Sequence, residues 1–315
     1  MKQRTTAGLK ACTTTVAIVS SCVLLQAKGE VLLHNAFVEQ LRNRVTIEAD
    51  FLIDAVHPHP NTIGTSSEDG DLHVAGRSPQ VGLPMVAELA NGRLNAVAGV
   101  EQLIHQNLGK TVHVTGVWRL WMEHKSVKAM TQGNKVVPPT KNKTNPQHVF
   151  EIHPMTIFQG TPVLETFAPV HDDKKPSDHY VASDAKTAFA RYEKATLTVS
   201  RAAVFTSFDG PQTPYNYTEF ILEVAAPRQD VPDGAFVDAK ILDLQKQVLV
   251  NDSRRMVLVK GTRPATVIGA AAVGKQIHVL GIPRINLNQV VQKVAAGHKD
   301  VVPGAYEMII LAVIE

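Results

Sequence analysis

A short segment of this chain occurs twice, and this repeat constrains the fold more than any other sequence feature. Residues 109–120 are matched by residues 274–285, with identical Gly-Lys, His-Val, Gly and Arg positions. Self-similarity of this kind indicates that one structural unit is used twice. Both copies carry apolar residues at alternate positions, such as Val112 and Val114, which is the pattern of a β-strand. The repeat therefore predicts β structure in both halves of the chain.

The N-terminus has the three parts of a secretory signal. Lys2, Arg4 and Lys10 precede a mostly apolar run over residues 11–25, and Ala27 is a small residue suited to peptidase cleavage. A membrane anchor needs about 20 apolar residues, and serine and threonine residues interrupt this shorter run. We therefore expect cleavage after residue 27 and a secreted or periplasmic mature chain without a transmembrane span.

A lipoprotein is the alternative at this end of the chain. Residues 19–22 resemble a bacterial lipobox, which would make Cys22 the lipidated N-terminus. The apolar residues 23–25 speak against it, because polar linkers usually follow a lipid anchor. Cys12 and Cys22 are the two cysteines of the sequence, so a chain that is cut after Ala27 contains no disulfide, although the compartment permits them.

Signal removal also changes the charge of the chain. The formal net charge of +3 comes from the three basic residues of the signal, so the mature chain has equal numbers of basic and acidic residues. A nearly neutral chain lacks the broad positive surface of a nucleic-acid-binding protein. Nucleic acid is therefore an unfavoured partner, and the most basic stretch is a polar insert over residues 125–147.

Strand and helix patterns follow a similar order in the two halves. The first half predicts strands over 45–53, 71–75 and 85–89, a helix over 97–108, and strands over 110–120 and 148–153. The second half predicts strands over 195–205, 218–225 and 256–260, a short apolar segment over 265–273, and strands over 275–285 and 306–313, with an additional strand over 235–244. Three strands, a helix and two strands are the order of the OB-fold, a small Greek-key barrel. We predict a mainly β protein with small α content, built from two tandem OB-like Greek-key β-barrel units related by the internal repeat.

Prolines and charged residues mark the boundary between these units. The predicted organisation is a signal over 1–27, a first OB-like barrel over 28–160, a linker with a short helix over 161–192, and a second OB-like barrel over 193–315.

Two short motifs resemble uncharacterised exported bacterial proteins with OB-like β-barrels. They are Asp69-Gly70-Asp71-Leu72-His73 and Glu151-Ile152-His153-Pro154. The resemblance implies an exported β-barrel protein and carries no activity with it.

Histidines on predicted strands suggest a metal site. His113 and either Glu151 or His153 lie on neighbouring strands, where cross-strand side chains approach to about 5 Å. Imidazole and carboxylate are ligands of zinc and related ions, so the candidate metal ligands are His73, His113, Glu151 and His153. No spacing matches a known ligand signature. His113 also has a counterpart in His278, which favours a structural hydrogen bond for this pair.

The candidate ligand-binding residues are Trp118, Arg119, Trp121 and His113. Indole rings serve as stacking platforms for bases, and arginine adds cation–π contacts. Because Trp118 and Arg119 are adjacent on a strand, they point to opposite faces, and one tryptophan is expected in the core. Arg119 is matched by Arg284, so the pair alternatively predicts a repeated salt bridge or carbonyl contact at a barrel end.

Catalytic and cofactor motifs are not found. The sequence lacks a Gly-x-Ser-x-Gly elbow and a glycine-rich phosphate loop, and we expect no cofactor. The residues around Asp69 and Asp71 lack most of an EF-hand loop and predict a hairpin turn instead. The leading hypothesis is an exported, non-catalytic binding or envelope-associated protein whose partner is a cell-envelope polymer or another protein. A metal-dependent hydrolase and a single-stranded nucleic-acid-binding protein are the alternatives, so enzymatic activity stays open.

Overall fold

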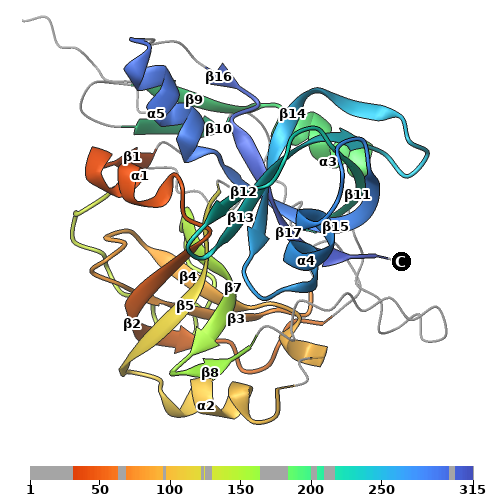
Figure 1. Cartoon of the computed structure of the whole chain (residues 1–315). Helices are drawn as coiled ribbons and strands as arrows, with labels where there is room; N and C mark the ends of the chain where they lie inside the picture. The colour runs from red at the N-terminus through yellow and green to blue at the C-terminus, as the bar shows by residue number, and fades with distance from the viewer. Residues whose placement is uncertain are drawn as a thin grey trace, which may run out of the picture.

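The structure is a computed structural model that describes residues 31–62, 69–94, 97–121, 124, 130–163, 184–199, 204–208, 217–297 and 302–314. The strands of these residues form three β-sheets, and short helices connect the strands along the chain (Figure 1). The protein is mainly β with a small helical content, which confirms the predicted fold class. The predicted signal over 1–27, both cysteines and residues 164–183 of the predicted linker lie outside the described residues.

The first barrel is formed by the strands that the first half predicts. They are β2 (Thr46–Val56), β3 (Leu72–Arg77), β4 (Met85–Leu89), β5 (Thr111–Leu120) and β7 (Phe150–Phe158), with the short β8 (Thr161–Pro162) at the edge. Antiparallel pairing joins them in the order β4-β3-β2-β5-β7-β8, and a parallel pairing of β4 with β7 closes the ring. A 3-10 turn (Gly92–Leu94) and helix α2 (Val100–Gln106) connect β4 to β5. This is the element order expected for a small Greek-key barrel.

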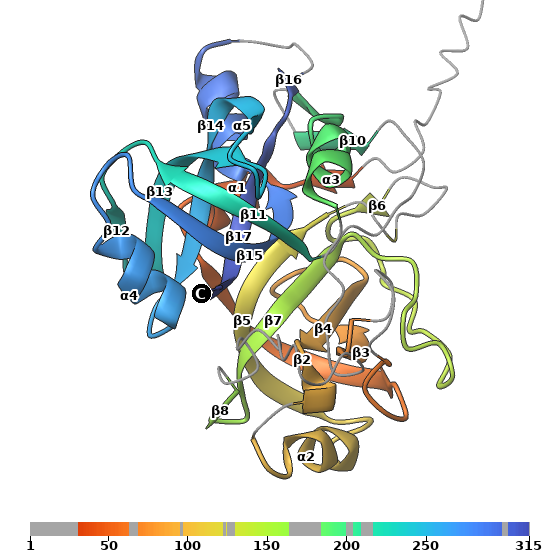
Figure 2. The same cartoon turned by 90° about the vertical axis from the view of Figure 1, so that its right-hand side faces the viewer.

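The second sheet pairs its five main strands in the same way around a ring: the first strand pairs with the second and the fourth, and the fifth pairs with the third and the fourth. Its strands are β11 (Thr218–Val224), β12 (Gln229–Val231), β13 (Gly234–Leu242), β14 (Val248–Val259), β15 (Gln276–Ile285) and β17 (Tyr306–Val313). They pair in the order β11-β15-β17-β14-β13-β12, and β11 also pairs with β13. The pairing of β14 with β17 is parallel, as it is between β4 and β7. Helix α4 (Arg263–Gly269) connects β14 to β15, and Figure 2 shows this unit above the first barrel.

A third sheet contains the two strands that the sequence predicts at the start of the second barrel. The strands β9 (Ala195–Val199) and β10 (Val204–Phe208) were expected to open the second barrel, but they pair with β1 (Val31–Leu33), β6 (Met130–Thr131) and β16 (Val302–Pro303) in the order β16-β9-β10-β1-β6. The second barrel instead begins at β11. Apolar and β-branched residues predict a strand correctly here, but they do not say which sheet the strand joins.

Three further helices of the described residues do not connect the third and fourth strands of a barrel as α2 and α4 do. They are α1 (Asn35–Leu41), α3 (Ala185–Tyr192) and α5 (Leu287–Ala295). The sequence predicts α3, which begins after Asp184, whose carboxylate accepts a hydrogen bond from the Thr187 amide. Phe189 of α3 packs edge-on against Phe220 of the second barrel. No helix of the described residues is long and apolar enough to span a membrane.

The matched segments occupy corresponding strands, β5 and β15. Gly109 and Gly274 precede these strands with φ of 81° and 85°, in the left-handed region that favours glycine. Within the strands, a Cβ on Gly116 would lie 2.6 Å from the Pro154 carbonyl oxygen, and one on Gly281 would lie 2.9 Å from that of Ile309. The backbone conformation and the close contacts at these four positions therefore explain why each of them is a glycine. The internal repeat itself stays a prediction.

Candidate functional site

Polar side chains gather on the outer face of the first barrel. Alternate residues of β3, β4 and β7, such as Val74, Ala87 and Ile152, belong to the apolar core. The residues between them point the opposite way, because side chains alternate across a strand. This outer face is nevertheless buried, and we call its polar members and two aspartates before β3 the histidine–carboxylate cluster: Asp69, Asp71, His73, Glu88, Glu151 and His153.

His153 lies at the centre of this cluster and is fully buried. Its Nε2 is 3.2 Å from Asp71 Oδ2 and 2.9 Å from Tyr217 Oη, and the tyrosine donates to the same Asp71 oxygen at 2.5 Å. Its Nδ1 is 3.1 Å from Glu88 Oε2 and 3.4 Å from Glu151 Oε2. Because Tyr217 directly precedes β11, this contact joins the first barrel to the second.

Glu151 connects the cluster to two further cationic or basic groups. Arg119 Nη1 donates to Glu151 Oε2 at 2.5 Å, and the residues face each other across β5 and β7. Glu151 Oε1 lies 3.0 Å from His148 Nε2, and the His148 ring stacks on His124 at 4.8 Å between centroids. Glu151, His148 and His124 thus extend the polar network along the same face of the barrel.

Burial and the packing of like charges perturb the pKa values of the cluster. Burial raises the pKa of Asp69 to about 7 and that of Glu88 well above its ordinary value, and it lowers the pKa of His73 to about 4. Burial alone would raise the pKa of Glu151, but Arg119 and His148 hold it well below its ordinary value. Burial alone would lower the pKa of His153, but Glu88 and Asp71 raise it well above its ordinary value. Strong perturbation in one group of residues is typical of functional sites.

The structure brings together three of the four predicted metal ligands and corrects the fourth. His73 Nε2 lies 3.6 Å from Glu88 Oε1, and Glu151 and His153 are in direct contact, so these side chains share one site. His113 is not part of it. Its side chain is half exposed and its Nδ1 lies 3.4 Å from Asp50 Oδ1 across β2 and β5. The register explains this difference, because Arg119, and not His113, lies opposite Glu151.

His113 and His278 have similar surroundings in the two barrels. His278 Nε2 lies 3.5 Å from Glu219 Oε2, and Glu219 belongs to the first strand of its barrel, as Asp50 does. Each histidine of the matched segment therefore faces a carboxylate on the neighbouring strand. This arrangement supports a structural role for the pair. A ligand-binding role of His113 stays a prediction.

The residues of the predicted aromatic ligand-binding group lie inside the protein, and a ligand-binding role for them stays a prediction. Trp118, Arg119 and Trp121 are all buried. Trp118 Nε1 donates to the Arg44 carbonyl at 2.7 Å, and the Trp121 ring packs edge-on against Tyr192. Both indole rings are thus engaged in packing.

The two matched arginines join the barrels to each other. Arg119 Nε donates to the Pro283 carbonyl at 2.9 Å, and Arg284 Nη1 donates to the Trp118 carbonyl at 3.0 Å. Each guanidinium also donates to a glutamate of its own barrel, Arg119 to Glu151 and Arg284 to Glu307. The predicted salt bridge and carbonyl contact are therefore present in both copies. Trp118 has a role here as well, because the Arg284 guanidinium lies 3.6 Å from its ring centroid.

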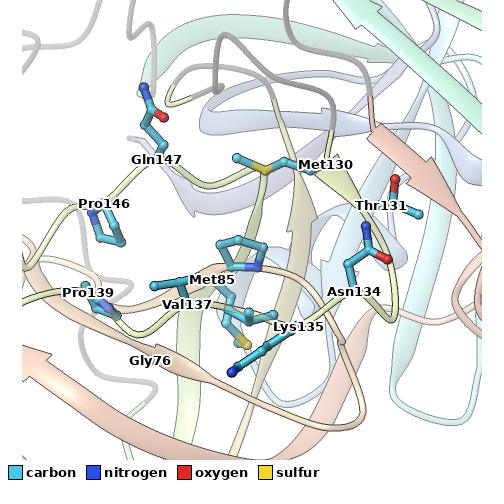
Figure 3. A pocket seen from close by; sticks show the side chains of 12 residues that line it. Gly76, Met85, Met130, Thr131, Asn134, Lys135, Val137, Pro139, Pro146 and Gln147 are labelled. Carbon is cyan, nitrogen blue, oxygen red and sulfur yellow. The ribbon is translucent and has the colours of Figure 1, made fainter.

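A second candidate site lies between the first barrel and the polar insert. A cleft of about 450 Å³ opens beside the β3–β4 hairpin, and we call it the insert cleft (Figure 3). Its lining residues are Gly76, Pro84, Met85, Met130, Thr131, Asn134, Lys135, Val136, Val137, Pro139, Pro146 and Gln147. Val137 is 76% exposed, and Lys135 is exposed as well. The cleft thus offers apolar contacts next to a positive charge.

Sequence reasoning missed Asp71, Glu88, His148 and Tyr217. Glu88 is the one polar residue of Met85–Leu89, and an acidic residue in an otherwise apolar strand is a signal that could have identified it. Asp71 directly precedes β3, and its sequence surroundings predict only a turn that leads into a strand. Tyr217 comes from the other half of the chain, so no local pattern connects it to this site.

We compared the chain with protein-family models and with curated proteins. Neither comparison finds a match for it.

Proposed function

We propose that this chain is an exported, non-catalytic binding protein that holds an acidic, partly apolar peptide segment in the insert cleft. The composition of residues 1–27 supports export. The observation that carries the proposal is the insert cleft itself, which combines one edge of the first barrel with the most basic stretch of the sequence.

The lining of the cleft favours a peptide as the ligand. Met130 and the valine and proline side chains provide apolar contacts, and methionine adapts its shape to different apolar partners. None of the lining residues is aromatic. Lys135 in the lining, with Lys141 and Lys143 exposed further along the insert, favours acidic side chains on the partner.

The adjoining strand supports an extended conformation of that peptide. β6 contributes Met130 and Thr131 to the lining, and it is the last strand in the order of its sheet. Edge strands are the places where an extended peptide is added to a sheet, with its alternate side chains in neighbouring pockets. The peptide therefore has main-chain as well as side-chain contacts available to it.

A defined peptide set tests this function. Fluorescence anisotropy with labelled acidic–apolar peptides, the same peptides with lysine in place of the acidic residues, and an anionic oligosaccharide should show binding of the acidic peptides alone. The variant Val137→Asp with Lys135→Glu should lose this binding. Val273→Asp with Lys275→Glu, a matched change at another exposed valine, should keep it.

Two results would contradict the proposal. Equal binding by both double variants would place the peptide elsewhere, and binding of the oligosaccharide alone would replace the peptide by an envelope polymer. For export, the mass of the mature N-terminus distinguishes cleavage after Ala27 from a lipid on Cys22.

A further inference from the structure

Three side chains of the histidine–carboxylate cluster have the spacing of metal ligands. Asp71, Glu88 and His153 each present one ligand atom, and these atoms all lie within 4.8 Å of one another. A tetrahedral zinc ion holds nitrogen and oxygen ligands at about 2.0–2.2 Å, so that the ligands are roughly 3.4 Å apart. Asp71 contacts the Nε2 side of the His153 ring and Glu88 contacts the Nδ1 side, so one of these side chains has to turn before a single ion binds all three. None of the three residues lines the insert cleft, so this site is separate from the proposed peptide site.

Unpaired buried atoms give a second, independent reason. Glu88 Oε2 and His153 Nδ1 are buried and make no hydrogen bond, although they lie 3.1 Å apart. Buried polar atoms are nearly always hydrogen-bonded, because an unpaired one loses its contact with water without compensation. A cation that takes one lone pair from each atom satisfies both of them.

The charges of the cluster point in the same direction. Four carboxylates are buried together, those of Asp69, Asp71, Glu88 and Glu151. Arg119 is paired with Glu151, which leaves three carboxylates around the imidazoles of the cluster. Burial of like charges is costly unless a cation compensates them. The His153 imidazole faces Asp71, Glu88 and Glu151, and a divalent ion bound there would add positive charge to the same group.

We propose that Asp71, Glu88 and His153 bind one divalent transition-metal ion, for which Zn²⁺ is the probe of choice. The imidazole ligand separates this site from the all-oxygen sites of Ca²⁺ and Mg²⁺. Neighbouring groups orient the ligands, as outer-shell partners do in metal sites. Tyr217 donates to Asp71, and His73 lies 3.6 Å from Glu88 Oε1.

The ion has a structural role in this arrangement. At most 2% of each of the three ligand side chains is exposed, which leaves no room for a substrate at the ion. The ligands come from β4, β7 and the residue before β3, and Tyr217 adds the start of the second barrel. An ion here would hold together residues on the outer face of the first barrel, and the hydrogen bond from Tyr217 to its ligand Asp71 would connect it to the start of β11. This differs from the hydrolase alternative, which requires an open coordination position.

Native mass spectrometry and calorimetry test the site. The full chain is stripped with a chelator, its fold is checked by near-UV circular dichroism, and Zn²⁺ is titrated back. We expect one ion per chain and a higher melting temperature in its presence. Glu88→Gln keeps the size of the side chain and removes a ligand charge. It should weaken Zn²⁺ binding by more than the roughly 10–100-fold effect of losing an outer-shell partner.

Controls separate this site from adventitious binding. His113→Gln removes a histidine on the exposed part of the same barrel, and His57→Ala with His59→Ala removes the two neighbouring surface histidines. Both variants should bind Zn²⁺ as the unaltered chain does.

Three outcomes would overturn the proposal. The first is a folded chain that binds no Zn²⁺ at about 100 μM, a concentration at which a site with a Kd of about 1 μM is almost fully occupied. The second is loss of binding in the His57/His59 variant. The third is unchanged binding in Glu88→Gln. If Glu88→Gln does not fold, the titration of the unaltered chain decides alone, through its stoichiometry and its melting temperature. Failure of Zn²⁺ binding leaves the peptide site unaffected, because the anisotropy assay reads the insert cleft.

Discussion

Replacing Arg284 by methionine should destabilise the protein strongly. The guanidinium is fully buried between the barrels, where it donates to Glu307 at 2.6 Å and to the carbonyl oxygens of Val45, Trp118 and Arg44 at 3.0–3.2 Å. Burial lowers its pKa to about 10, so it stays charged at neutral pH. Methionine fills much of the same space but donates no hydrogen bond.

The size of this effect follows from the contacts that are lost. Removing one partner of a buried ion pair costs about 3–5 kcal/mol, and each hydrogen bond to a carbonyl contributes about 1 kcal/mol. Glu307 keeps its hydrogen bond from Arg255, which reduces the first cost. We therefore expect the free energy of unfolding to fall by about 3–5 kcal/mol, a large part of the roughly 5–15 kcal/mol that is typical of a folded protein.

Urea denaturation measures this change. Tryptophan fluorescence reports the site directly, because Arg284 lies against the Trp118 ring, and far-UV circular dichroism reports the sheets. Arg228→Met is the control, because Arg228 is exposed and pairs with the exposed Asp230, so its loss should cost less than about 1 kcal/mol. If Arg284→Met loses as little as the control, the buried joint between the barrels contributes little and the reasoning is wrong.

Other changes have smaller or more local consequences. Gly116→Ala places a Cβ 2.3 Å from Ile152 Cγ2, so the free energy of unfolding should fall by about 3 kcal/mol, and a loss under about 1 kcal/mol in urea would contradict the close approach. Trp118→Phe removes the 2.7 Å hydrogen bond to the Arg44 carbonyl and should cost about 1–2 kcal/mol in the same assay. Asp184→Ala removes the N-cap of α3 and should cost about 1 kcal/mol at neutral pH. Hydrogen bonds from the Thr187 hydroxyl and then from the Thr187 amide lower the pKa of Asp184, so its contribution is present above about pH 4 and is lost as the pH falls through that lowered pKa. A difference between the two proteins that stays constant from pH 7 to pH 3 would refute this cap.

Much of the fold could be predicted because the barrel strands have clear apolar patterns and a helix between the third and fourth strand. The third sheet could not, since β1, β6 and β16 are too short to show an alternating pattern. Residues 195–205 do predict strands, but their partners come from distant parts of the chain. Sequence periodicity identifies strands and leaves their partners open.

The candidate metal ligands could be predicted only in part, because the sequence does not fix the register of β5 against β7. The insert between them is long, so the turn that sets the register of a hairpin is missing. The register places Arg119 opposite Glu151 and leaves His113 near the other end of β5. His73 and Glu88, in contrast, face each other across the neighbouring strands β3 and β4, and this pair could be found by alternation alone.

The third sheet has a consequence for how the polypeptide can be divided. β1 and β6 come from the segment before the predicted linker, whereas β9, β10 and β16 come from the segment after it. A break in the linker would therefore give two fragments that each carry part of one sheet, with unpaired edges that fit each other. Such fragments should reassemble without a covalent connection, so that the linker is the natural position for a split-protein reporter built from this chain.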